Sequence, residues 1–139
     1  MGLLSSMRIS GSALTAQRLR MDVVAGNIAN ADTTRTNGQR APYQRQEVVF
    51  QPLVDGAAAS PGEGLQVAAI VRDPAPARQV YDPTHPDADP QTGLVAYPNV
   101  DTTTEMTDLL SASRAYEANV TVLNSIKQMA QRSIDLGRA

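Results

Sequence analysis

The chain has 139 residues, no cysteine, one histidine and a formal net charge of −2 at pH 7. This length corresponds to one domain, and without a basic patch carrying interleaved aromatic residues the composition excludes nucleic acid as the main partner. The lack of cysteine excludes disulfides, thiol nucleophiles and thiolate metal sites. Aromatic residues make up 4% of the chain, with a single Phe and no Trp. The core that the chain can form alone is therefore small, and long helices in it are expected to bury surface against other subunits.

The first predicted helix covers residues 5–29. Its apolar residues recur every seven positions, a spacing that places them on one face of an amphipathic helix of coiled-coil period. This stripe consists of Met7, Leu14, Met21 and Ile28. Gly11 and Gly26 lie inside the helix and each costs about 1 kcal/mol relative to alanine, so the helix is expected to be marginal until it is packed. The small and amide residues at 27–34 predict its end and a turn.

The middle of the chain differs sharply from both ends. All nine prolines fall between Pro42 and Pro98, which separates this segment from regions that must be helical. Short runs rich in Val, Ile and Tyr, separated by Pro, Gly and Asp turns, predict strands. These strands are expected at residues 44–50, 64–72, 78–82 and 93–97. Residues 55–64, rich in Ala, Gly and Ser, are predicted to form a mobile loop.

The second predicted helix covers residues 103–136 and would be about 50 Å long at roughly 1.5 Å per residue. Thr102 and Glu105 match the pattern of a capping box at its start. Its stripe consists of Leu109, Tyr116, Leu123 and Ala130, flanked by Ala112, Val120, Ile126 and Ile134. Residues 1–30 hold three arginines and one aspartate, whereas residues 101–117 hold one arginine and four carboxylates. Opposite charges therefore favour pairing of the two helices, although exposed ion pairs contribute only about 0–1 kcal/mol each.

These elements predict a mainly α protein with a small β insertion, in which the N- and C-terminal amphipathic helices pair as a coiled coil around a central segment of short strands. The predicted division is 1–30 for the N-terminal helix, 31–100 for the turn and the Pro-rich β-containing insertion, and 101–139 for the C-terminal helix. A chain this small cannot cover two such apolar stripes by itself. Oligomerisation is therefore expected.

Three carboxylates and His85 lie close together in DPTHPDAD, at residues 82–89. A cation site is disfavoured because the glycine-permitted turn and late glutamate of calcium loops are missing. Hydrolysis by Asp87 or Asp89 would require a desolvated cleft that splits their pKa values, and this segment lacks apolar neighbours. We interpret it as a rigid Pro-Asp turn. Nucleophile elbows, phosphate-binding glycine loops and zinc spacings are absent from the sequence, so no enzyme activity, cofactor, metal or small-molecule substrate is expected.

The sequence resembles the axial proteins of the bacterial flagellum, specifically the basal-body rod family and within it the C-type proximal rod proteins. The N-terminal signature shared by rod and hook proteins is matched by SGSALTAQ at 10–17 and NIANA at 27–31. The C-type assignment depends on VYDPTHPDAD at 80–89, VAYPNV at 95–100, Glu105-Met106 and SASRAYEANV at 111–120. The resemblance covers nearly the whole chain.

The resemblance implies a structural subunit of the proximal rod that polymerises helically through its terminal helices to form the torque-transmitting shaft. It implies contacts with other rod proteins, with copies of itself and with the flagellar type III export apparatus, and the membrane ring as a further neighbour. The rod crosses the periplasm. Because no apolar signal-peptide core is present at the N-terminus, export without a cleaved signal is expected. The alternatives are a B-type rod subunit and a soluble helical adaptor or export chaperone.

The predicted assembly interface combines the two stripes with the amide residues near them. It consists of Met7, Leu14, Met21, Ile28, Asn27, Asn30, Leu109, Tyr116, Asn119, Val120, Leu123, Ile126 and Ile134.

Overall fold

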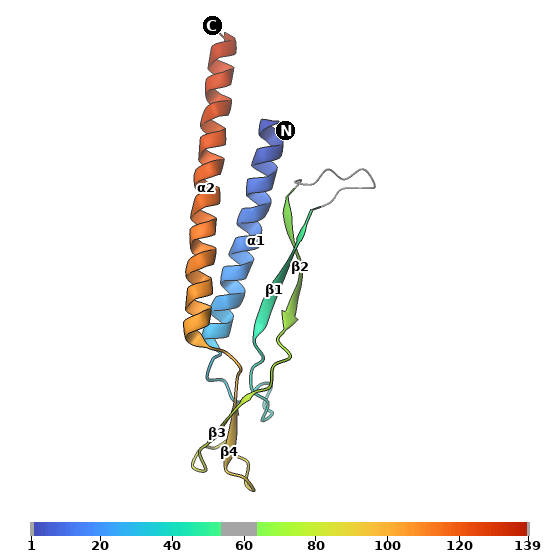
Figure 1. Cartoon of the computed structure of the whole chain (residues 1–139), viewed down its shortest axis with the longest axis vertical. Helices are drawn as coiled ribbons and strands as arrows, with labels where there is room; N and C mark the ends of the chain where they lie inside the picture. The colour runs from blue at the N-terminus through green and yellow to red at the C-terminus, as the bar shows by residue number, and fades with distance from the viewer. Residues whose placement is uncertain (1, 54–63, 139) are drawn as a thin grey trace.

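The computed structural model describes residues 2–53 and 64–138, which form two long helices and four strands (Figure 1). In chain order these are α1 (Leu3–Ala29), β1 (Gln46–Pro52), β2 (Leu65–Arg72), β3 (Arg78–Tyr81), β4 (Leu94–Tyr97) and α2 (Thr102–Arg138). The predicted mainly α architecture with a small β segment between terminal helices is confirmed. The predicted loop at 55–64 lies, except for Gly64, outside the described residues.

The two helices pack against each other and run in opposite directions, so that both chain ends lie at the same end of the molecule (Figure 1). Helix α2 has 37 residues and α1 has 27. The difference of ten residues corresponds to about 15 Å of helix. The C-terminal end of α2 accordingly projects past the start of α1 (Figure 1).

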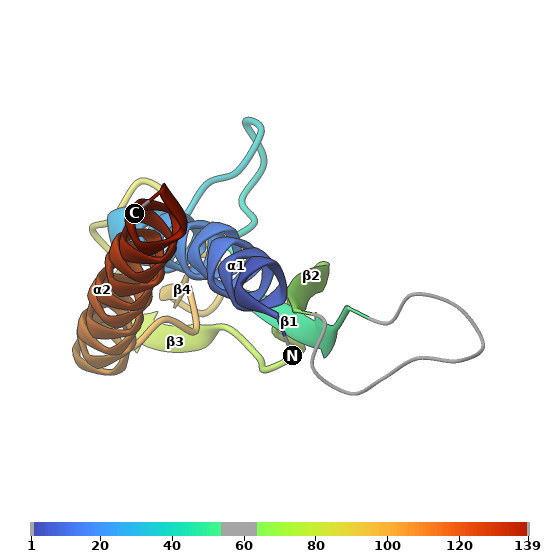
Figure 2. The same ribbon diagram turned by 90° about the horizontal axis from the view of Figure 1, so that it is seen from above.

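The strands form two separate antiparallel ribbons. In the β1–β2 ribbon, Gln46 lies opposite Arg72 and Pro52 opposite Leu65, with a bulge between Val49 and Phe50. The β3–β4 ribbon pairs residues 78–81 with residues 94–97. Figure 2 shows α1 between α2 and the β1–β2 ribbon, and α1 contacts all three of these elements. Among the described elements, α2 packs only against α1.

The buried core is small, as the low aromatic content predicts. Its apolar members are Ala16, Val24, Ala31, Val95, Ala112 and Ile126. Three polar residues, Ser10, Asn27 and Glu105, are buried with them. None of the described helices combines the length and hydropathy needed to cross a membrane.

The start of α2 differs from the predicted capping box. The N-cap is Asp101, whose carboxylate accepts hydrogen bonds from the backbone N–H of Thr103 at 3.1 Å and from the Thr104 hydroxyl at 2.8 Å. These bonds hold the pKa of Asp101 below its usual value. The capping-box prediction for Thr102 and Glu105 is wrong. Asp101, one position earlier, is as good an N-cap as threonine and caps the helix instead. The Glu105 side chain is therefore not needed for capping and points into the protein.

Candidate functional site

A buried polar junction joins the end of α1, the start of β1 and the start of α2. Its centre is Asn27, which is fully buried. The Asn27 amide nitrogen donates to the Gln46 carbonyl at 2.8 Å and to the Glu105 carboxylate at 2.9 Å. The Asn27 amide oxygen accepts from the Gln46 backbone N–H and from the Tyr43 hydroxyl, both at 2.9 Å. An asparagine side chain has two donors and two acceptor sites, so Asn27 uses its whole hydrogen-bonding capacity here.

The second half of the junction is a buried ion pair. Arg45 Nε lies 2.6 Å from a Glu105 carboxylate oxygen, and the Glu105 side chain is 1% exposed. Burial alone would lower the pKa of Arg45, but the hydrogen bond and the charge of Glu105 outweigh it and raise that pKa. Burial, and then the charge of Glu105, raise the pKa of the Tyr43 hydroxyl, which keeps it a hydrogen-bond donor. Removing one member of such a buried pair leaves an uncompensated charge.

The junction fixes how the three elements meet, because each contributes a group that the others need.

The sequence analysis did not identify Tyr43, Arg45 and Glu105 as members of this junction. It placed Asn27 in the assembly interface, whereas the structure directs all four of its hydrogen bonds to residues of the same chain. The partners lie 16 to 78 residues away in sequence, so no local pattern could have identified them.

The predicted stripe of α1 lies at the edge of its packed face. Met7, Leu14, Met21 and Ile28 are all half-buried. The buried residues of α1 are instead Ser10, Ala16, Val24 and Asn27. Asn30, also half-buried, donates to the Gly26 carbonyl at 2.9 Å and caps the helix end. The structure thus leaves part of each stripe residue on the surface.

The predicted stripe of α2 is divided in the same way. Ile126 is buried, and Ala112, about four turns earlier in the helix, is fully buried. The half-buried members are Leu109, Tyr116, Asn119, Val120 and Leu123. The Asn119 amide donates to the Ala115 carbonyl of its own helix at 2.8 Å. Ile134, at the projecting end of α2, is 61% exposed.

A further row of apolar residues on α2 was not predicted. Val122, Met129 and Leu136 are spaced by seven residues and are 48%, 50% and 80% exposed. We call these three residues the exposed row. Their spacing places them on one face of the helix. Met129, Ile134 and Leu136 lie beyond the first 27 residues of α2, which is the length of α1, in the part of α2 that projects past the start of α1 (Figure 1).

The predicted Pro-Asp turn is present between β3 and β4. Asp87 accepts hydrogen bonds from the Thr34 hydroxyl at 2.8 Å and from Arg35 Nε at 3.0 Å, which ties the turn to the segment after α1. His85 Nδ1 accepts the backbone N–H of Asp87 at 3.1 Å. Hydrogen bonds from Thr34 and then Arg35 hold the pKa of Asp87 below its usual value. A lowered carboxyl pKa is the opposite of what a general acid needs.

Within residues 2–53 and 64–138, no group of three His, Cys, Asp or Glu residues is placed to hold a metal ion.

Comparison with known proteins agrees with this architecture. Residues 91–136 match the family described as flagellar basal body rod FlgEFG protein C-terminal, and residues 7–35 match the family described as flagella basal body rod protein. The flagellar basal-body rod protein FlgC of Yersinia enterocolitica is 48% identical, over 99% of this chain and 100% of the relative. FlgC of Borreliella burgdorferi is 44% identical and FlgC of Bacillus subtilis 43%, each over 96% of this chain and 97% of the relative. The resemblance to C-type proximal rod proteins is thereby confirmed: the chain belongs to the FlgC family of flagellar basal-body rod proteins.

Proposed function

We infer that the chain is a structural subunit of the proximal rod of the bacterial flagellar basal body. Together with copies of itself and with other rod proteins, it assembles helically into the shaft that transmits torque. The observation that carries this inference is the full-length similarity to FlgC proteins in a chain whose two long terminal helices leave apolar residues exposed. A helical assembly is what heterologous contacts produce when they do not close into a ring.

The proposed assembly surface is the accessible part of both helices. It comprises the half-buried stripe residues of α1 and α2, the exposed row and Ile134. Neighbouring subunits would complete coiled-coil packing along these positions, since apolar residues at seven-residue spacing fit such packing. Asn27 contributes from inside, because the junction sets the angle at which α1 and α2 leave the β segment. Asn30 and Asn119 contribute hydrogen bonds to backbone carbonyls of their own helices rather than apolar area.

The proposed placement of the chain follows from this surface. Residues 1–30 and 101–139 form the inner, helical layer of the rod, and residues 31–100 face outward. The subunit lies in the periplasmic part of the basal body, with the membrane ring as a neighbour. It reaches that position through the flagellar type III export apparatus, without a cleaved signal peptide.

Folding and assembly are proposed to be coupled. Several buried residues of the two helices, such as Ser10, Ala16 and Ala112, are small or polar and bury little apolar area. The junction holds one end of the helix pair, whereas the opposite end has no comparable network among the described residues. The terminal helices would then be weak enough to stay unfolded during export and would become fully ordered against neighbouring subunits.

The test places an aspartate in the stripe of α2. Leu109→Asp and Leu123→Asp should each block rod assembly while the protein is still produced, because a carboxylate cannot be buried between helices without a partner. Asn124→Asp, on the exposed side of the same helix, is the matched control and should preserve swimming. Basal bodies isolated from each strain and viewed by electron microscopy give the readout. Normal rods and motility in both leucine variants would refute the proposed surface and favour a helical adaptor.

A further inference from the structure

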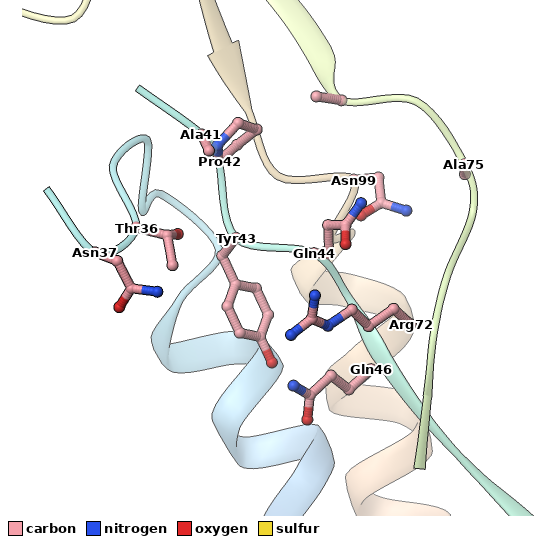
Figure 3. Close-up of a pocket in the computed structure, with 11 residues that line it drawn as sticks. Thr36, Asn37, Ala41, Pro42, Tyr43, Gln44, Gln46, Arg72, Ala75 and Asn99 are labelled. Carbon is pink, nitrogen blue, oxygen red and sulfur yellow. The ribbon is translucent and has the colours of Figure 1, made fainter. Parts of the chain in front are cut away.

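A cavity of about 470 Å³ lies away from both helical stripes, between the chain entering β1 and the chain leaving β2 (Figure 3). One wall is formed by residues 41–44 and Gln46 and the other by Arg72, Ala75 and Ala77, with Asn99 above them. Asn37, at the tip of a tight turn with a positive φ of 53°, forms part of the rim. The Tyr43 ring and Pro42 add apolar surface to the lining.

One polar group of this cavity is a buried donor without an acceptor. The Asn99 amide oxygen accepts the backbone N–H of Arg45 at 3.3 Å, which assigns the other end of the side chain as the nitrogen. That Asn99 nitrogen is buried and has no hydrogen-bond partner. A buried donor left unpaired is unfavourable, and native structures usually supply an acceptor.

The lining also contains one cation, the exposed Arg72. Arg72 makes no hydrogen bond or ion pair with any residue that the structure describes, although it projects toward Tyr43 and Gln46 (Figure 3). No carboxylate is among the described residues that line the cavity. Glu47 and Asp73, which adjoin the lining residues Gln46 and Arg72 in sequence, each lie 3.7 Å from Arg45. The cavity therefore combines a guanidinium with amide donors and lacks an anion of its own. A carboxylate satisfies such a set with charge-assisted hydrogen bonds.

We propose that this cavity binds an aspartate or glutamate side chain of a neighbouring copy of the chain. A second copy is the occupant because the family assembles into a rod and the chain has exposed acidic residues available. Asp22, Asp32, Glu117 and Asp135 are exposed and form no ion pair within residues 2–53 and 64–138. The carboxylate would pair with Arg72 and accept from Asn99, and its aliphatic stem would lie against Pro42 and the Tyr43 ring. This outer contact rests on the rod function but is independent of the helical stripes.

The sequence offers a sharp test, because Lys127 is its sole lysine. Gln44→Lys combined with Lys127→Arg places a single lysine amine at the cavity. Carbodiimide treatment of isolated basal bodies joins that amine to any carboxylate in contact with it, and mass spectrometry identifies the linked residue. The expected product is a covalent dimer of this chain through an Asp or Glu. Gln79→Lys with Lys127→Arg, on exposed β3, is the control and should give no such dimer.

Adding Arg72→Gln should reduce the dimer about tenfold, the effect of losing one charge-assisted contact. The proposal is overturned by the absence of a dimer, by a link only to a different rod protein, or by a yield that Arg72→Gln does not change. The two proposals are tested separately by the presence of rods. Rods should still form in the Arg72→Gln strain, whereas a chain that cannot act as a rod subunit would give no rods.

A second measurement does not depend on rod assembly and therefore still tests the site if the substituted chains fail to form rods. The unsubstituted 139-residue chain is titrated with N-acetylglutamate amide and, as a control, N-acetylglutamine amide, while nuclear magnetic resonance follows the side-chain amides of Asn99 and Gln44. Saturable shifts with the glutamate compound alone are expected. Equal shifts with both compounds, or none, would overturn a carboxylate site.

Discussion

At the scale of single residues, the junction around Asn27 carries the strongest stability prediction. Asn27→Ala would remove the Asn27 partner of both Gln46 backbone groups, of the Tyr43 hydroxyl and of one buried Glu105 oxygen. The expected loss is on the order of 3 kcal/mol in the free energy of unfolding, measured by urea denaturation of the purified chain. Asn30→Ala, which removes one hydrogen bond to the Gly26 carbonyl in a half-buried position, should cost about 1 kcal/mol. Equal losses would contradict the role given to the junction.

Asp87 carries the pH prediction. Its pKa is lowered in the folded chain by hydrogen bonds from Thr34 and Arg35, so the folded state binds the proton less readily than the unfolded state. The stabilisation is therefore present above the unfolded pKa of about 4 and is lost as the pH falls through the lower folded pKa. Asp87→Asn should lower the melting temperature at pH 7 and match the natural chain at the most acidic pH. Asp22→Asn, exposed on α1, should follow the natural chain throughout; a constant offset for Asp87→Asn at every pH would contradict the argument.

Glu105 shows where prediction from the sequence ends at this scale. A threonine followed three residues later by a glutamate satisfies the capping-box pattern, and the pattern cannot tell whether the carboxylate turns back to the helix or into the protein. Here an aspartate at position 101 caps the helix and Arg45 takes the carboxylate. Burial against a residue 60 positions away is a tertiary effect, which local spacing does not encode.

At the scale of elements, the local signals were sufficient for the helices and strands. Heptads and the confinement of proline to the middle predicted helices at 5–29 and 103–136, close to Leu3–Ala29 and Thr102–Arg138. The turn residues predicted all four strands, and each predicted strand end lies within about two residues of the observed one. The exposed row was missed because α2 carries apolar residues on more than one face. Which of them are covered depends on how α2 lies against α1, and this is not a property of α2 alone.

The arrangement of α2 also predicts a gradient of stability along it. Its first turns are held by the junction, whereas its last turns project past α1 and carry the exposed Met129 and Leu136. In the purified monomer, backbone amides around Ala112 should exchange hydrogen at least about tenfold more slowly than those around Leu136, because local opening costs more where side chains are buried. In isolated rods the two regions should be protected alike. Uniform exchange along α2 in the monomer would contradict coupled folding and assembly.

At the scale of the whole molecule, removing the projecting end of α2 should affect assembly but not folding. Ending the chain after Gln128 leaves 27 residues of α2, equal to the length of α1, and retains buried Glu105, Ala112 and Ile126. Such a chain should keep its urea midpoint almost unchanged, because the residues removed are largely exposed. It should nevertheless fail to form rods, since it lacks Met129, Ile134 and Leu136. A chain ending at Met106 should lose both properties. Swimming cells with the Gln128 truncation would show that the rod does not use the projecting surface.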